Sequence, residues 1–342
     1  MEGLIMEIDA FVNQLKSKYD YSDEMEQFLK KAVPAIITYY GEDKKNIIFA
    51  SLSECEIHIQ KENENTEQYL NQYFGTNKEW DIPFLGGAFQ HTELSLNNNQ
   101  VNQKNIIYLK TEYLHMYKPF DFNDEKKLSS IIHEMCHAIK GYGKLKVEDG
   151  KVITSTGLIK DYYEYDRESN SFKDTKSDNT GLEEAFNSYD EASIMTIMTG
   201  RFQEYGAYKG MTQIARKLMK HEELAQIIRI SQFSGGNEWI EFLGKEDSEY
   251  LSKNFEEWIS VLYSSPSELM NDKLGLMEKM NMAIDKLTQF VNNYTSPKEF
   301  KQFDETRKNA DETILQHLKQ IIQYRENNNL FEVIQENETK TL

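Results

Sequence analysis

The sequence predicts an α+β fold, with a small mixed sheet in the first 200 residues and helices through the rest of the chain. Three observations favour this class. Runs of β-branched and alternating residues at 55–60 and 105–110 are typical of strands. Apolar residues at three- and four-residue spacing in 123–141 indicate an amphipathic helix. Beyond residue 200, apolar and aromatic residues recur at spacings that indicate one helix after another.

The first sixty residues are expected to form two helices and a strand. The second helix covers 23–40, and Pro34 inside it predicts a kink or a break, because proline removes a backbone donor and clashes with the preceding turn. From Asn46 the sequence becomes rich in β-branched residues, and it alternates most clearly at 55–60. The pattern therefore predicts a change from helix to extended structure in this segment.

The central helix is delimited more clearly than the segments before it. Residues 80–87 are expected to form a loop, and 94–105 is rich in Asn and Gln without usable periodicity. Asn123 suits a helix N-cap, and Lys140 followed by Gly141 suits the C-terminal end. The apolar stripe of this helix would pack on a core and leave the other face for polar side chains.

Residues 151–166 are expected to form a hairpin, with strands around Val152 and Tyr163. A polar loop is predicted over 167–180. A second strong helix covers 180–200, where the final glycine suits the end of a helix. The chain thus offers two well-defined helices separated by a hairpin.

The chain is strongly acidic, with 57 Asp and Glu against 39 Lys and Arg and a formal net charge of -18. Such a charge repels phosphate backbones and anionic lipid, so we expect neither nucleic acid nor a membrane as a partner. The N-terminus lacks the pattern of a secretory signal. The two cysteines, Cys55 and Cys136, agree with a reducing compartment. We predict a cytoplasmic protein, although leaderless secretion would leave the same sequence.

The chemistry is predicted from the run His133-Glu134-Met135-Cys136-His137. Two histidines four residues apart on a helix project from one face, so both imidazoles can bind one zinc ion per chain. Glu134 would lie near the activated water, where it could take a proton and pass it to a leaving amine. The alternative is a chance match in a helical interaction protein. Cys136 lies on a different helical face and is expected to be a buried free thiol.

These residues resemble the HExxH zinc metallopeptidases, or zincins, and in particular the gluzincin branch. The resemblance covers the strand at 105–110 and the helices at 123–141 and 180–200, which is under a third of the chain. It implies a third zinc ligand from a glutamate on the second helix and an edge strand that pairs with extended substrate. It also implies a Tyr or His that stabilises the oxyanion during hydrolysis of a peptide or protein substrate.

Glu184 is the predicted third ligand, with Glu183 as its rival. Thr180 and Glu183 have the spacing of a capping box, which would occupy Glu183 at the helix N-terminus and leave Glu184 free. The segment around Glu184 also resembles the gluzincin pattern, in which an acidic or amide residue precedes the ligand. Four positions after the ligand this chain lacks the acid that many members carry, so Asn187 or Glu191 is expected to orient a histidine instead.

The remaining parts of the site are less closely defined. The strand at 106–109, with Ile107 and Tyr108 at its centre, is the candidate for pairing with substrate backbone, although an ordinary core strand has the same pattern. The residues considered as oxyanion stabilisers share only an aromatic or imidazole side chain in the right part of the chain. They are Tyr163, Tyr165 and His221 as the preferred candidates, with Tyr162, Tyr205 and Tyr208 beside them.

The sequence therefore predicts a zinc metallopeptidase. An endopeptidase is favoured, because 87–91 lacks the glutamate with which gluzincin aminopeptidases grip a free amino terminus. The predicted domains are a helical segment at 1–40, a zincin-like catalytic domain at 41–200 and a helical domain at 201–342. A non-catalytic zinc-binding or partner-binding protein with a zincin-like fold remains the alternative, and the intact Glu134 argues against it.

Overall fold

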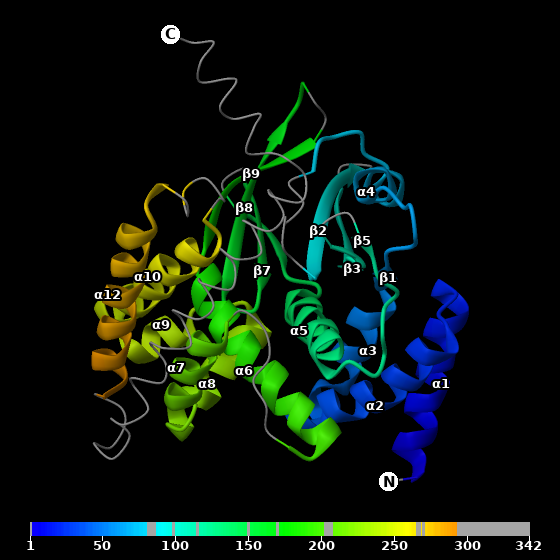
Figure 1. Cartoon of the computed structure of the whole chain (residues 1–342), viewed down its shortest axis with the longest axis horizontal. Coiled ribbons are helices and arrows are strands. Elements are labelled where there is room, and N and C mark those ends of the chain that lie inside the picture. The colour runs from blue at the N-terminus through cyan, green and yellow to red at the C-terminus, as the bar shows by residue number, and fades with distance from the viewer. Residues whose placement is uncertain are drawn as a thin grey trace.

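The structure combines many helices with small sheets, as expected of an α+β protein (Figure 1). It is a computed structural model. The described residues are 2–80, 87–97, 100–113, 116–148, 151–168, 171–201, 208–264, 268 and 271–292. None of the helices in these ranges combines the length and apolar character needed to cross a membrane.

The N-terminal part consists of α1 (Glu2–Tyr19), α2 (Asp23–Tyr40), a 3-10 turn at Glu42–Lys44 and α3 (Lys45–Ser53). Helix α2 continues through Pro34, so the predicted break does not occur. The extended structure predicted from Asn46 is also wrong, because this segment is helical. Its apolar residues Ile48 and Leu52 are four apart, so one helical face reaches the core, and that packing outweighs the β-branched composition.

The first sheet has the order β1-β3-β2, formed by β1 (Cys55–Ile59), β2 (Ala88–Asn97) and β3 (Gln100–Leu109). Strand β3 is parallel to β1 and antiparallel to β2, so the sheet is mixed. The strands predicted at 55–60 and 105–110 are confirmed. The absence of periodicity at 94–105 was misleading, since this segment forms the far ends of β2 and β3, where polar side chains lie outside the core. The loop predicted at 80–87 falls almost wholly outside the described residues.

Helix α4 (Thr66–Phe74) packs on one face of this sheet. After β3 the chain forms a two-stranded antiparallel ladder of β4 (Glu112–Tyr113) and β5 (Met116–Tyr117). Helix α5 (Glu125–Gly141) lies against the other face. The predicted central helix is therefore confirmed, but its N-cap is Asp124, whose carboxylate accepts a hydrogen bond from the backbone N–H of Lys126. The predicted cap, Asn123, instead bonds to Asp121.

The second sheet is antiparallel, in the order β6-β7-β8-β9. Its strands are β6 (Leu145–Glu148), β7 (Lys151–Thr156), β8 (Ile159–Asp166) and β9 (Ser171–Asp178). The predicted hairpin is confirmed, and Val152 pairs with Tyr163. The polar loop predicted over 167–180 is wrong, because most of it is β9, an edge strand whose largely exposed polar side chains give no apolar alternation.

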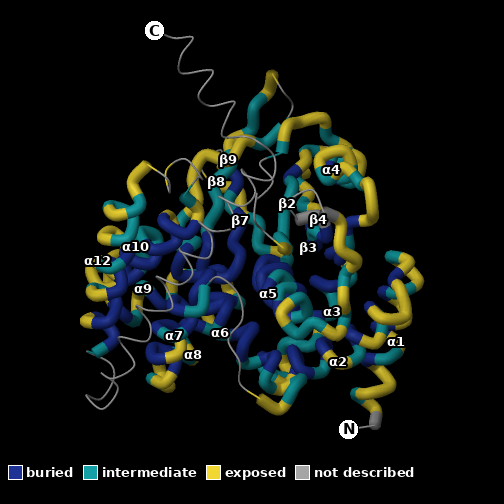
Figure 2. Tube along the Cα trace, viewed as in Figure 1, coloured by how far each residue is buried: buried dark blue, intermediate teal, exposed yellow. Residues whose placement is uncertain are grey.

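Helix α6 (Thr180–Thr199) ends at Gly200 as predicted, and α7 (Lys209–Leu218), α8 (Glu222–Ser234), α9 (Glu238–Leu243), α10 (Lys245–Leu262) and α12 (Lys273–Asn292) follow. Helix α6 joins two hydrophobic cores. Leu182 and Phe186 pack with α7, α8, α9, α10 and α12, whereas Ile194 and Met195 pack with α1 to α3 and α5. Figure 2 shows the resulting buried band along α5 and α6. Helix α6 therefore contributes buried residues to both cores, whereas α5 contributes to one of them.

Candidate metal centre

A group of metal-binding side chains lies between α5 and α6. His133 and His137 come from α5, Glu184 comes from α6, and all three residues are buried. Their ligand atoms lie within 4.8 Å of one another. Nε2 of His133 is 2.9 Å from one Glu184 oxygen, and Nε2 of His137 is 3.4 Å from the other. The four-residue spacing places both imidazoles on one face of α5, so a single carboxylate on the facing helix reaches both.

Two further side chains of α6 hold His133 from behind. Nδ1 of His133 hydrogen-bonds to Oε2 of Glu191 at 3.1 Å, which leaves Nε2 directed at Glu184. Asn187 donates to the backbone carbonyl of His133 at 2.9 Å. Both predicted orienting residues thus contact the same histidine, and a carboxylate on the outer imidazole nitrogen is the usual support of a metal-binding histidine.

The electrostatics of the group follow from its burial and its charges. Burial lowers the pKa of His133, but the hydrogen bonds to Glu184 and Glu191 outweigh it, and the pKa is raised well above the ordinary value. Burial acts to raise the pKa of Glu184, yet attraction to His137 and His133 holds it far below the usual range. Without a metal, the cluster therefore stabilises a positive charge between its carboxylates. A divalent cation would supply that charge from the centre of the group.

Glu134 connects α5 to the first sheet. Its Oε2 accepts a hydrogen bond of 2.8 Å from the backbone N–H of Gln90, on β2. Burial raises the pKa of Glu134, partly offset by His133 and His137. The carboxylate is thus close enough to both histidines for their charge to lower its pKa, while it is hydrogen-bonded to β2, an edge strand of the sheet. The sequence did not reveal the role of Gln90, because the β2–β3 hairpin was not predicted.

Glu183, the rival ligand, points in another direction. Its carboxylate accepts a hydrogen bond from the backbone N–H of Leu158 at 2.9 Å and pairs with Lys140 at 2.5 Å. The capping box predicted for it is wrong. Helix α6 is preceded by Asn179 in the left-handed conformation, with φ of +66°, and the side chain of Thr180 does not serve as the cap. Glu184 is therefore the one of the two that meets the histidines.

The strand predicted to bind substrate is not available for that purpose. Ile107 and Tyr108 are fully buried and lie on β3, the central strand. Their backbone pairs with β1 on one side and β2 on the other, so no hydrogen-bonding edge is left for another chain. The edge strand beside α5 is β2, and Gln90 lies on it.

The preferred oxyanion candidates have other contacts. His221 caps α8 by accepting from the backbone N–H of Leu224, Tyr165 packs on Phe172, and Tyr163 lies in the second sheet. Tyr162 stands beneath the ammonium of Lys176, and Tyr205 lies outside the described residues.

Tyr208 is the tyrosine that reaches the histidines. Its ring lies 5.7 Å from that of His133 at an interplanar angle of 26°, and its hydroxyl meets that of Tyr263. Nothing in the sequence pointed to Tyr263, which is 55 residues away and follows α10.

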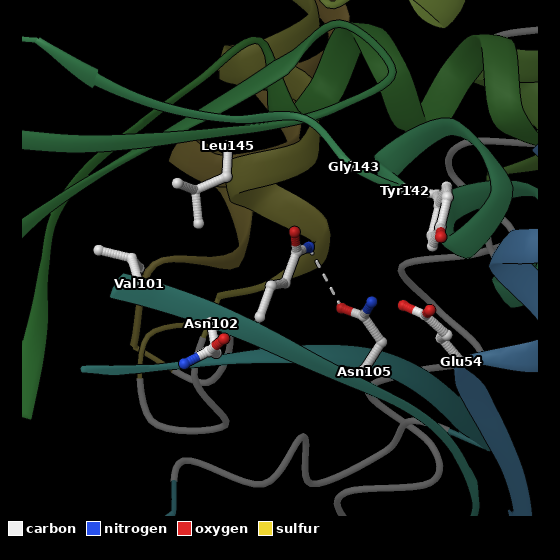
Figure 3. Close-up of a pocket in the computed structure, with 8 residues that line it drawn as sticks. Glu54, Val101, Asn102, Asn105, Tyr142, Gly143 and Leu145 are labelled. Atoms are coloured by element: carbon white, nitrogen blue, oxygen red, sulfur yellow. Dashed lines mark hydrogen bonds between the residues drawn. The ribbon is translucent and has the colours of Figure 1, made fainter. Parts of the chain in front are cut away.

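A polar cavity of about 250 Å³ lies beyond the C-terminal end of α5 (Figure 3). Its lining includes Glu54, Tyr142 and the polar end of β3. Two hydrogen bonds lead towards this cavity from Gln90, the β2 residue that binds Glu134. The Gln90 side chain donates to Thr92, and Thr92 donates to Asn105. The cavity is thus separate from the metal-binding group but lies along the same face of the sheet.

The donor set fits a metal ion. Two imidazole nitrogens and a carboxylate are the ligands that zinc takes in catalytic sites, with a further position left for water or substrate. In the deprotonated state all three groups present lone pairs to the same point, which is unfavourable unless a cation or a proton lies between them. Comparisons with known protein families, with curated proteins and with solved structures found no match to this chain.

Proposed function

We propose that the chain is a zinc-dependent metallopeptidase with a zincin-like arrangement of the gluzincin type. The observation that supports it most is the convergence of His133, His137 and Glu184 on one point, with Glu134 directly after His133 on α5. A site that only binds metal needs the first three residues. A partly buried carboxylate beside them, that of Glu134, is useful for moving a proton.

In this proposal the two imidazoles and Glu184 would hold one zinc ion. When bound, zinc would lower the pKa of water and polarise the scissile carbonyl. Glu134 accepts the proton of the attacking water and then donates it to the leaving amine nitrogen, so one carboxylate acts as base and then as acid. Glu191 keeps Nε2 of His133 directed at the centre through its bond to Nδ1.

Substrate would lie along β2. An extended peptide added to this edge continues the sheet through backbone hydrogen bonds, which suits an endopeptidase that accepts the interior of a chain. The N–H of Gln90 already bonds to Glu134, so substrate and Glu134 would meet at the same point of the strand. Tyr208, whose ring stacks on that of His133, is the proposed hydroxyl donor to the oxyanion.

The test is zinc content together with cleavage of a mixed peptide library. Wild type should carry about one zinc per chain and cleave, because three ligands converge. Glu134→Gln should keep the metal and lose cleavage, whereas Glu184→Gln should lose metal affinity. His221→Asn is a matched control, since Asn is also a good N-cap and this histidine serves α8.

Each failure has a distinct meaning. A wild type without zinc, even after reconstitution, would leave HExxH as a coincidence in a helical protein. Zinc binding with no cleavage, and no difference between wild type and Glu134→Gln, would support the non-catalytic alternative.

A further inference from the structure

A second buried cluster of charges lies behind the metal-binding group, between the same two helices. Lys140 on α5 is fully buried, and its ammonium pairs with Glu183 at 2.5 Å and with Asp190 at 3.1 Å. The hydroxyls of Tyr39 and Tyr40, on α2, donate to the two oxygens of Asp190 at 2.6 and 2.9 Å. The cluster thus ties α2, α5 and α6 together, and its three charged side chains are buried.

The residues around Glu183 provide hydrogen-bond donors and space for its carboxylate. Besides the N–H of Leu158, it accepts hydrogen bonds from the Gln232 amide at 3.1 and 3.2 Å. Gly157, with φ of +62°, forms the turn before β8, and a Cβ there would lie 2.3 Å from the Glu183 carboxyl carbon. The turn, α8 and α5 therefore all meet this one side chain.

Stability alone is a poor explanation for such a cluster. Removing two acids and an amine from water is costly, and well-packed apolar residues of the same size are often as stable or more stable. Burial acts to lower the pKa of Lys140, but Glu183 and Asp190 outweigh it and the pKa is raised, so the amine stays charged. A charged cluster does fix the relative position of the helices that carry it, because its hydrogen bonds and ion pairs form in only one arrangement of those helices.

The spacing along both helices connects the two clusters. Lys140 follows His133 by seven residues, or about two helical turns, and lies on the same face of α5. On α6 the acids occur as two adjacent pairs, 183–184 and 190–191, which are also seven apart. The first acid of each pair binds Lys140, and the second faces the histidines.

We propose that Lys140 is a positioning residue for the metal centre. By bonding to Glu183 and Asp190 it holds α6 in the one register that brings Glu184 to both histidines and Glu191 to Nδ1 of His133. A shift of α6 by one residue, about 1.5 Å along the axis and 100° around it, would carry both carboxylates away. This inference rests on the proposed function, since it assigns the role of Lys140 in that same site.

The test replaces the cluster as a unit. The triple variant Lys140→Met, Glu183→Gln and Asp190→Asn removes all its charges and the ammonium donor while keeping the approximate size of each side chain, and the two new amides can still hydrogen-bond to the remaining partners of Glu183 and Asp190. Zinc affinity, measured by chelator competition, should fall by about 10- to 100-fold, as for loss of a supporting residue. The visible spectrum of the cobalt-substituted protein should also change, because the ligands no longer hold one geometry.

The matched control is Ser51→Ala. Ser51 is buried and donates to the carbonyl of Ala138 at 2.8 Å, so it anchors the same helix from the α3 side. Its loss should lower Tm while zinc affinity and the cobalt spectrum stay as in wild type. A milder second variant, Tyr39→Phe with Tyr40→Phe, removes the two hydroxyls that help Lys140 to hold Asp190 and leaves the Lys140 pairs in place. It should weaken zinc binding by a few-fold, and it can be measured even if the triple variant fails to fold.

Unchanged zinc affinity in the folded triple variant or in the tyrosine pair would overturn the proposal. So would an equal loss of zinc affinity in Ser51→Ala, because general destabilisation would then explain it. A wild type that binds no zinc contradicts the proposed function itself, which separates that failure from this one.

Discussion

Two buried histidines in this protein each lie between two carboxylates, but their surroundings differ. His133, between α5 and α6, meets Glu184 through Nε2 and Glu191 through Nδ1. His58, on β1, meets Glu64 through Nε2 at 2.8 Å and Glu56 through Nδ1 at 3.5 Å. Taken alone, the two histidines have nearly the same partners.

The difference is what else reaches the carboxylates. At His133, a second imidazole approaches the same glutamate from the adjacent turn. At His58, the places around the carboxylates are taken by the hydroxyls of Tyr69 and Tyr108, and the Tyr69 ring stacks on the imidazole at 3.8 Å. The nitrogens of one imidazole point in opposite directions, so a single histidine cannot bring both of its acids to one ion.

The comparison teaches that the candidate metal site differs from the His58 cluster by the convergence of several ligand atoms, and not by the pairing of a histidine with acids. In the described part of the chain, His133, His137 and Glu184 are the residues whose ligand atoms meet. The predictions below test this difference, beginning with the largest effect.

The sharpest way to break the comparison is to remove the second imidazole. His137→Gln should reduce zinc affinity by roughly 10²- to 10³-fold, because the total binding free energy of a structural zinc site, about 10–16 kcal/mol, is shared by a few ligands. The site would then resemble that of His58. Zinc affinity from chelator competition checks it, and affinity within twofold of wild type would mean that the metal is held elsewhere.

Loss of the outer support should have a smaller effect. Glu191→Gln keeps the size of the side chain but weakens its bond to Nδ1 of His133, so zinc affinity should fall by about 10- to 100-fold. Glu64→Gln is the matched control at His58 and should leave zinc affinity unchanged. An equal loss in both variants would show that acidity in general, and not this hydrogen bond, governs binding.

The structural role of the second histidine can be tested directly. His58→Phe keeps an aromatic ring against Tyr69 but removes the bonds to Glu56 and Glu64, so the free energy of unfolding should fall by about 1–2 kcal/mol. Denaturant titration measures this change. Zinc content and peptide cleavage should be as in wild type, and a loss of zinc would contradict the distinction between the two clusters.

The comparison extends to a carboxylate that has no imidazole beside it. Asp161, on β8, accepts a hydrogen bond from Ser177 and lies near Asp174 and Asp178, and burial raises its pKa to about 6. Because the folded protein holds this proton more tightly than the unfolded chain, the contribution of Asp161 to stability declines as pH rises from about 4 through 6.

Asp161→Asn should therefore stabilise the protein at pH 8 by about 1 kcal/mol, after allowance for the partly solvated position, and change little at pH 3.5. Thermal unfolding at the two pH values checks this sign. A variant that is less stable at pH 8 would mean that the charged form of Asp161 is favoured by the fold.

Local signals were sufficient for the elements with regular patterns. The two site helices, the hairpin at 151–166 and the strands at 55–60 and 105–110 were predicted because each repeats its apolar residues at the period of one structure. The misses have a common cause. Helix α3, the distal β2–β3 hairpin and strand β9 lack such a period, since their character depends on what packs against them or on backbone pairing.

Glu184 lies beside the two histidines, as the predicted ligand should, but the argument that preferred it to Glu183 was wrong. The capping box that was expected to occupy Glu183 does not form, and a buried lysine occupies it instead. Lys140 was expected to favour the C-terminal end of the helix dipole, yet it is fully buried. Its position seven residues after His133 was the signal that could have placed it on the same face.

The sequence by itself determined which residues of α5 share a face, because the geometry of an α-helix depends only on spacing along the chain. It thereby determined that His133 and His137 can act together. Only the tertiary structure decided which acids face them, which strand is the edge and which tyrosine lies over the imidazole. Those relations join residues that are far apart in the chain, and they depend on how α6, β2 and the segment at Tyr208 pack around α5.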